Sequence, residues 1–158
     1  MLVFNESLVA LNHTAEDSTA VINLLAGKLF DQGLVAADYG KQTCARELIH
    51  PTGLPTRPFC IAFPHADAEG VHQSALALAT LKNPVTFKNM GDPDEDLQVH
   101  LVLMLANRNP DEQVKTLRNL AVLFGKPDKL QTLRDQSTSQ EVVIWLRREL
   151  RLDADSEG

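Results

Sequence analysis

The sequence predicts an α/β (α+β) fold in one domain, with a mixed parallel and antiparallel β-sheet flanked by helices. The chain has 158 residues, a length that suits a single domain with a sizeable core. Strand-like and helix-like segments alternate imperfectly, and several strand-like segments follow one another directly, which favours a mixed sheet over a purely parallel one. No repeat, low-complexity segment or linker interrupts the sequence, so we expect residues 1–158 to form one unit.

Two helices are predicted before the first strand. Within residues 16–32, apolar side chains recur at helical spacing, and Gly33 is well placed to end the helix. A second, less apolar helix is predicted for residues 36–49. The breaker cluster at residues 50–53 and the proline-containing residues 53–58 are predicted to form an ordered loop, because this composition suits neither a helix nor a central strand.

The strands are predicted in the middle of the chain. The shorter segments are a buried strand at 59–63 ended by Pro64, a loop at 65–70, strands at 74–81 and 84–87, and an acidic turn at 91–96. Residues 97–106 form a long and nearly continuous apolar run. Such a run predicts a strand that is buried on both faces inside the sheet.

The last third of the chain is predicted to be helical. Asn109 and Pro110, followed by two acids, are a start signal for a helix that Gly125 ends. Its buried stripe is expected to consist of Val114, Leu117, Leu120, Ala121 and Phe124.

Two shorter helices are predicted after Gly125. The first runs from Pro127 to about Arg134. Thr138 and Glu141 have capping-box spacing for the second, whose inward face is expected to hold Val142, Leu146 and Leu150. The polar tail at residues 153–158 is expected to be frayed.

Composition and charge argue against several classes of protein. A net charge of −6 argues against nonspecific nucleic-acid binding, which needs a basic surface. No stretch approaches the roughly 18 apolar residues of a membrane span, so we expect a protein that is not membrane-embedded. The N-terminus meets Glu6 too early for a signal peptide, and Cys44 and Cys60 form neither a disulfide framework nor a metal-type pair. These features predict a cytoplasmic protein with reduced thiols.

The histidines are the first candidates for chemistry. They are His13, His50, His65, His72 and His100. His65 stands out because it directly follows a short apolar strand and Pro64, and ligand sites in α/β sheets favour strand ends. From position alone, an ordinary surface histidine is the alternative. His100 lies in mid-strand, where a hydrogen-bonded structural histidine is expected, and His13 is expected in a polar, solvated loop.

A metal site is a second possible use of these residues. His65, Asp67 and His72 offer two imidazoles and a carboxylate within eight residues, with Cys60 nearby. These ligand types suit zinc or another divalent ion, although the spacing matches no common ligand pattern. A metal-binding enzyme therefore stays open as an alternative. The nucleophile-elbow, P-loop and dinucleotide-binding motifs are absent, so hydrolase and nucleotide-binding functions lack support.

Three motifs in order resemble the signature of the fructose/mannitol-type enzyme IIA domains of the sugar phosphotransferase system (PTS). They are Ala45-Arg46-Glu47, Pro51-Thr52-Gly53-Leu54-Pro55 and Ile61-Ala62-Phe63-Pro64-His65. In that family an Arg-Glu pair on a helix precedes a Thr-Gly loop and a strand that ends in Pro-His. The resemblance continues through residues 97–106 and the helix start at Asn109, so it spans nearly the whole chain. It implies the mixed, helix-flanked sheet of that family.

The resemblance also implies a function, that of a phosphotransferase with a phosphohistidine intermediate. His65 would be the phosphoacceptor, Arg46 would stabilise phosphate charge, and Thr52, Gly53 and Pro64 would shape the pocket. The implied donor is the phosphocarrier protein HPr, and the implied acceptor is a cysteine of the IIB component of a membrane sugar permease, with no cofactor and no metal. An imidazole suits such a relay because its neutral form is nucleophilic near neutral pH.

One position departs from the family pattern. Many members carry a second histidine at the start of the helix after the long strand, and the corresponding residue here is Gln113. A glutamine can donate a hydrogen bond but cannot titrate, so we expect either a neutral orienting group or an ordinary exposed first-turn residue. Gln113 and residues 114–118 resemble the galactitol-type branch, which implies galactitol or a related polyol or sugar. A regulatory, nitrogen-type enzyme IIA that acts by phosphorylation-dependent protein binding is the alternative.

Overall fold

The computed structural model describes residues 2–153, apart from the side chain of Pro110. The α-helices are α1 (Ser18–Asp31), α2 (Tyr39–Ile49), α3 (Val114–Phe124), α4 (Pro127–Arg134) and α5 (Ser139–Glu149). The strands are β1 (Val9–His13), β2 (Gly53–Leu54), β3 (Cys60–Ala62), β4 (Ala75–Asn89) and β5 (Asp92–Ala106). Short 3-10 helices are η1 (Glu6–Leu8), η2 (Ala68–Gly70) and η3 (Pro110–Gln113).

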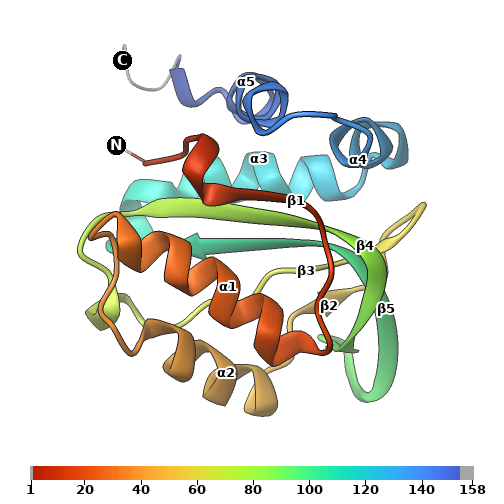
Figure 1. Ribbon diagram of the computed structural model, residues 1–158, viewed down its shortest axis with the longest axis horizontal. Helices are drawn as coiled ribbons and strands as arrows, with labels where there is room; N and C mark the ends of the chain where they lie inside the picture. The colour runs from red at the N-terminus through yellow and green to blue at the C-terminus, as the bar shows by residue number, and fades with distance from the viewer. Residues whose placement is uncertain (1, 154–158) are drawn as a thin grey trace.

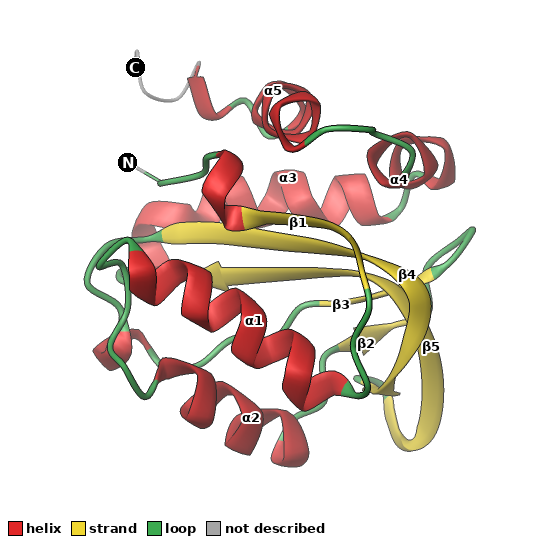
Figure 2. Ribbon diagram, viewed as in Figure 1, coloured by secondary structure: helices red, strands yellow, loops and turns green. Residues whose placement is uncertain are grey.

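The strands form one mixed sheet between two layers of helices. Helices α1 and α2 lie on one side of it, and α3, α4 and α5 lie on the other (Figures 1 and 2). Strand β4 pairs parallel with β1 and antiparallel with β5, while β3 pairs parallel with β5 and antiparallel with β2. The predicted fold class is confirmed. Because β3 and β5 run in the same direction, their carboxyl ends point to the same edge of the sheet, where His65 follows β3.

Several helices have local start or stop signals, and those at Gly33, Asn109 and Thr138 were predicted from the sequence. The Asp17 side chain accepts a hydrogen bond from the backbone N–H of Ala20 and begins α1, and Gly33 follows that helix with a φ of +71°. Asn109 caps η3 through the N–H of Asp111. The predicted N-cap of α5 is present, since the Thr138 hydroxyl oxygen accepts from the N–H of Glu141 at 3.1 Å, and the Thr138 hydroxyl donates to the Glu141 carboxylate at 3.2 Å.

The strand predictions needed four corrections. His13 belongs to strand β1 rather than to a polar loop, and the start of the predicted loop at 53–58 is the short strand β2. The predicted strands at 74–81 and 84–87 are one strand, β4, with a register shift between Thr80 and Val85. Most of the predicted acidic turn belongs to β5. Its acidic residues are tolerated in a strand because this end of the β4–β5 hairpin is exposed, and Lys88 forms an ion pair with Asp96 there.

The predicted buried stripe of α3 was confirmed at Leu120 but was wrong at Val114, Leu117 and Ala121. The buried residues along this face are Gln113, Thr116, Leu120 and Leu123, whereas Val114, Leu117 and Ala121 are exposed. Polar residues hold two of the buried positions because this end of the helix lies at the edge of the sheet that carries His65. For α5 the prediction is confirmed, since Val142, Leu146 and Leu150 are all buried.

The core lies along the paired halves of β4 and β5. Every residue from 75 to 81 and from 101 to 106 is buried, so the prediction of burial on both faces holds for this half of β5. It fails for residues 97–100, where Gln98 is exposed. None of the helices in the described part of the chain has the length and apolar character needed to cross a membrane. Of the tail predicted to fray, residues 154–158 lie outside the described residues, and Asp153 forms an ion pair with Arg147.

Candidate functional site

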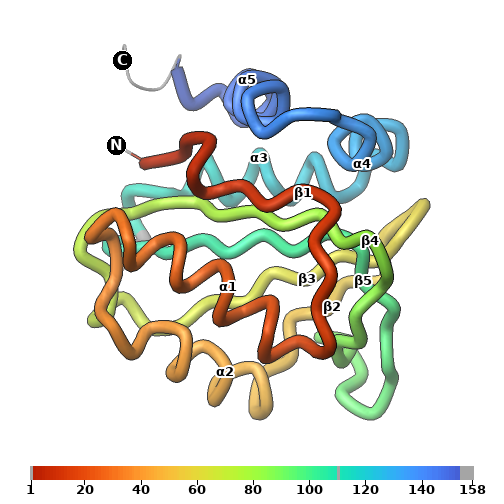
Figure 3. Tube along the Cα trace, in the orientation of Figure 1, coloured from red at the N-terminus to blue at the C-terminus, as the bar shows by residue number. Residues whose placement is uncertain are grey.

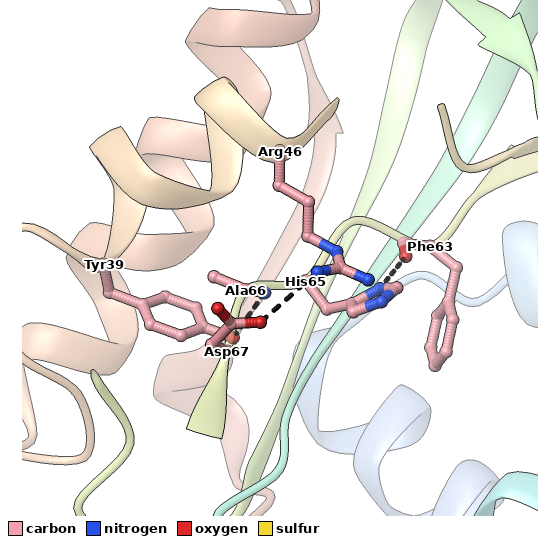
Figure 4. A network of polar contacts seen from close by, with 6 residues as sticks. All are labelled: Tyr39, Arg46, Phe63, His65, Ala66 and Asp67. Carbon is pink, nitrogen blue, oxygen red and sulfur yellow. Dashed lines mark hydrogen bonds and ion pairs between the residues drawn. The ribbon is translucent and has the colours of Figure 1, made fainter. Parts of the chain in front are cut away.

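His65 stands just beyond the carboxyl end of β3. Pro64 is buried and ends the strand, while His65 is only partly buried, so its ring is anchored but accessible. Its Nδ1 lies 3.0 Å from the carbonyl oxygen of Phe63 (Figure 4). A carbonyl oxygen can only accept, so Nδ1 carries the hydrogen, and in the neutral ring Nε2 then has the lone pair. The geometry therefore selects the tautomer in which Nε2 is the nucleophilic atom.

Phe63 connects the histidine to the helices on the far side of the sheet. Its ring lies 5.8 Å from the ring of Phe124 in α3, in an edge-to-face arrangement. The ring of His65 is 6.2 Å from that of Phe63. Such aromatic contacts favour defined ring orientations. Phe63 thus restrains the imidazole through both its carbonyl and its ring.

Arg46 extends from α2 toward the His65 ring (Figure 4). Its Nη1 lies 3.3 Å from Oδ1 of Asp67, and this pair is solvent-accessible, with the Asp67 side chain 80% exposed. The Nε–H of Arg46 is buried and has no hydrogen-bond partner. A buried donor without a partner is costly, so this guanidinium has capacity to bind an anion beside the histidine.

The segment after His65 is held by Tyr39, which sequence reasoning did not single out. The N–H of Ala66 donates to the Tyr39 hydroxyl oxygen at 3.3 Å (Figure 4). Tyr39 is fully buried, and this burial raises the pKa of its phenol above the usual value of 10.0, so the hydroxyl remains neutral. No periodic or motif signal marks this contact, because it joins a side chain to a backbone group 27 residues away.

Thr52 and Gly53, predicted to shape the pocket, are both buried. Thr52 is 3% exposed and lies behind the strand end rather than on an open surface. Gly53 has no room for a side chain, because an added Cβ would lie 2.5 Å from the carbonyl oxygen of Lys88. Gly53 therefore lies directly against β4, and both residues support the site from within.

Gln113 ends η3, which follows β5 at the same edge of the sheet. It is 5% exposed, and the Thr116 hydroxyl donates to its Oε1 at 3.1 Å. The expectation of an ordinary exposed first-turn residue is therefore wrong. This bond leaves the amide NH₂ as the donor end of Gln113, which fits the neutral orienting group that the sequence suggested.

The metal alternative gains no support from the geometry. Among residues 2–153, no group of three His, Cys, Asp or Glu side chains is arranged to hold a metal ion. Asp67 is engaged by Arg46, and His65 directs Nδ1 at a carbonyl. His72, the third proposed ligand, is exposed.

His100 differs from its prediction in its hydrogen bonding. It lies in β5 with its ring 5.9 Å from that of Phe59, and its buried Nδ1 has no hydrogen-bond partner. Desolvation, with a smaller contribution from nearby Arg134, lowers the pKa of His100. It is a structural histidine as expected, but its buried Nδ1 does not form the hydrogen bond that was expected.

The arrangement around His65 suits transfer of an anionic group between side chains. It provides a nucleophilic nitrogen at an accessible strand end, a carbonyl that stabilises the protonated Nδ1, and a guanidinium with a free donor. Transfer of a phosphoryl group needs mainly alignment and charge neutralisation, and these three features supply both.

Comparison with known proteins agrees with this chemistry. Residues 2–148 match the protein family described as "Phosphoenolpyruvate-dependent sugar phosphotransferase system, EIIA 2". The galactitol-specific EIIA component of the PTS of Escherichia coli (strain K12) is 33% identical over 117 residues, which cover 74% of this chain and 77% of that protein.

Solved structures share the fold. The complex of enzyme IIA(Mtl) with phosphorylated enzyme IIB(Mtl) from Escherichia coli gives a TM-score of 0.73 at 19% identity, covering 96% of this chain and 99% of the matched one. The nitrogen regulatory protein IIA-Ntr from Neisseria meningitidis gives 0.71 at 26% identity, covering 89% and 94%. Both TM-scores are well above the level of chance similarity.

Proposed function

The chain belongs to the EIIA 2 family of the phosphoenolpyruvate-dependent sugar phosphotransferase system, whose members are phosphotransferases, and we propose that it carries its phosphoryl group on Nε2 of His65. The observation that carries this proposal is the 3.0 Å contact between His65 Nδ1 and the Phe63 carbonyl. In the neutral ring it leaves the lone pair on Nε2, and the ring is only partly buried. Arg46 is the residue that stabilises the phosphoryl oxygens.

In the accepting step, the donor is the phosphohistidine of HPr. The Nε2 lone pair of His65 attacks phosphorus, a new N–P bond forms, and the N–P bond to the donor ring breaks with its electron pair returning to that ring. The His65 ring gains positive charge, which the Phe63 carbonyl stabilises through Nδ1–H. No proton has to move during this step, so a residue that titrates at the position of Gln113 is not required.

In the second step, a cysteine thiolate of the IIB component attacks the same phosphorus. A P–S bond forms, the P–N bond breaks, and the electron pair returns to Nε2 of His65. The mannitol enzyme IIA that shares this fold was solved in complex with phosphorylated enzyme IIB, which supports a IIB partner for this chain. We propose the same kind of acceptor here.

The substrate branch we propose is that of galactitol or a related polyol or sugar. Its support is the galactitol-specific relative and the glutamine at position 113. The IIA component does not contact the sugar. The proposed sugar specificity therefore shows itself only in the identity of the IIB component that accepts the phosphoryl group. Since the chain of transfers starts from phosphoenolpyruvate, we place the reaction in the cytoplasm.

A regulatory role is the second candidate, favoured by the likeness to IIA-Ntr. It would use the same phosphorylated histidine and differ only in the recipient. Incubating the phosphorylated protein with a galactitol-type IIB separates the two. Loss of phosphate to the IIB cysteine supports transport, whereas retention in the presence of an active IIB supports regulation.

The acceptor residue is tested by labelling. Wild-type protein incubated with phosphoenolpyruvate, enzyme I and HPr should gain one acid-labile, base-stable phosphoryl group, detected by intact mass. His65→Ala should fold and gain none, while the exposed-histidine control His72→Ala should label as the wild type does. Normal labelling of a folded His65→Ala protein would show that His65 is not the acceptor.

A further inference from the structure

Both oxygens of the Glu47 carboxylate accept hydrogen bonds from one residue, Thr52. Its Oε2 accepts from the backbone N–H of Thr52 at 2.6 Å, and its Oε1 accepts from the Thr52 hydroxyl at 2.6 Å. Glu47 follows Arg46 on α2, but it is turned toward the loop rather than toward the histidine. Desolvation raises the pKa of Glu47, and the two hydrogen bonds from Thr52 oppose that shift. A partly buried carboxylate held in this way restrains the loop more strongly than an apolar residue would.

Thr52 passes this restraint to the strand that carries the histidine. The N–H of Phe63 lies 3.2 Å from both the hydroxyl oxygen and the carbonyl oxygen of Thr52. Thr52 thus donates to Glu47 and accepts from Phe63 with the same hydroxyl. Because Thr52 is 3% exposed, water cannot easily replace either partner.

Phe63 is the last link, since its carbonyl accepts from His65 Nδ1 at 3.0 Å. The backbone of this one residue is therefore fixed at its N–H by Thr52 and fixes the imidazole with its C=O. A continuous chain of hydrogen bonds runs from α2 to the imidazole: Glu47, Thr52, Phe63, His65. None of these bonds involves an atom that would contact phosphate, so Glu47 acts at a distance from the transferred group.

We propose that Glu47 is a positioning residue which, through Thr52, holds the Phe63 carbonyl where it keeps His65 in the Nδ1–H tautomer. The inference rests on the proposed role of His65 as phosphoacceptor. In the other tautomer Nε2 carries the hydrogen and has no lone pair for phosphorus. Loss of the chain therefore lowers the fraction of molecules able to react, without touching the surface that a donor protein recognises.

Two variants break the chain at different links. Glu47→Ala removes both acceptors from Thr52, and Thr52→Val removes the hydroxyl while keeping the shape of the side chain. Glu47→Gln keeps an acceptor for one of the two Thr52 donors, so it should show a smaller defect than Glu47→Ala. Thr56→Val is the matched control, because the Thr56 hydroxyl donates to the Phe59 carbonyl in the same loop at 2.7 Å but is not linked to His65.

The first measurement is the tautomer of His65 in the unphosphorylated proteins, read from the ¹⁵N shifts of its ring nitrogens by NMR. Wild type and Thr56→Val should show Nδ1 protonated and Nε2 bare. Glu47→Ala and Thr52→Val should show a mixture of the two tautomers, with Glu47→Gln between them and the wild type. A wild-type tautomer in folded Glu47→Ala and Thr52→Val proteins would overturn the proposal.

The second measurement is the rate of phosphorylation by HPr. In Glu47→Ala the kcat should fall by about 10-fold, by analogy with partners that fix the tautomer of a metal-bound histidine, with little change in the KM for HPr. A rise in KM at constant kcat would contradict a positioning role and indicate a docking role.

If Glu47→Ala does not fold, Thr52→Val and Glu47→Gln decide the outcome. The tautomer readout needs no phosphate, so failure of this inference is distinguishable from normal labelling of His65→Ala, which would refute the proposed acceptor itself.

Discussion

At the residue scale, Arg46 illustrates how the resting site is prepared for an anion. Its Nη1 pairs with the exposed Asp67, and its buried Nε has no partner. An exposed ion pair contributes little to stability, roughly 0–1 kcal/mol, whereas a preorganised donor matters most when negative charge is present beside it. The value of Arg46 therefore lies in the reaction rather than in the fold.

Removing Arg46 should separate these two effects. Arg46→Ala should slow phosphorylation by about 100-fold, because a donor aimed at the transferred group is lost, while the free energy of unfolding changes by less than about 1 kcal/mol. Stopped-flow phosphorylation and urea denaturation measure the two quantities. The exposed arginine variant Arg118→Ala serves as the control and should change neither. Unchanged kinetics in Arg46→Ala would remove this residue from the site.

The same scale shows what the sequence could and could not predict. His65 was identifiable because a proline ends an apolar strand immediately before it, and because the neighbouring residues form a motif. The contacts of Tyr39 and Glu47 could not be identified from the sequence, although Glu47 lies within one of the motifs. Each bonds a backbone N–H in another segment, and neither hydrophobic periodicity nor residue type reveals which backbone group a buried side chain will reach.

At the element scale, the β4–β5 hairpin and α3 mark where pattern reasoning failed. The exposed residues 82–84 look like a break between two strands, but the hairpin continues through them with a register shift. Near the start of α3 the apolar Val114 and Leu117 are exposed, while the polar Thr116, and Gln113 just before the helix, are buried. Hydrophobicity predicts an inward face only where the interior is apolar, and this end of α3 lies beside the polar site.

The contact of β2 with β4 gives a prediction at this scale. Gly53→Ala would place a methyl group 2.5 Å from the Lys88 carbonyl, so the two strands must move apart, and we expect a loss of roughly 1–3 kcal/mol in the free energy of unfolding. Urea denaturation measures the loss. Gly91→Ala is the matched control in the same hairpin, because its added Cβ meets its nearest neighbour, Asn89 Oδ1, at an ordinary 3.6 Å. Equal stability of the two variants would show that β2 does not approach β4 so closely.

At the scale of the whole molecule, the C-terminal helices are joined to the N-terminal segment. The Arg147 guanidinium donates to the Phe4 carbonyl at 3.1 Å, and α5 packs beside η1 and β1 (Figure 3). The buried face of α5 completes the core on the side of the sheet opposite α1 and α2. The sequence predicted one domain from length and the absence of a linker, but which distant segments meet depends on tertiary contacts that it does not display.

These contacts predict that the chain unfolds as one unit. Fluorescence of Trp145, the only tryptophan, reports on α5, and far-ultraviolet circular dichroism reports on all the helices and strands. The two signals should change at the same urea concentration, as in a two-state transition. A fluorescence transition at clearly lower urea would mean that the C-terminal helices form a separate unit.

The central claim is that one nitrogen of one ring carries the phosphoryl group. We would label the histidines with ¹⁵N, phosphorylate the wild-type protein through HPr, and record the coupling between phosphorus and the ring nitrogens. The structure predicts coupling to Nε2 of His65, with Nδ1 still protonated toward the Phe63 carbonyl. Phosphorus attached to Nδ1 of His65, or to any other residue, would contradict the account.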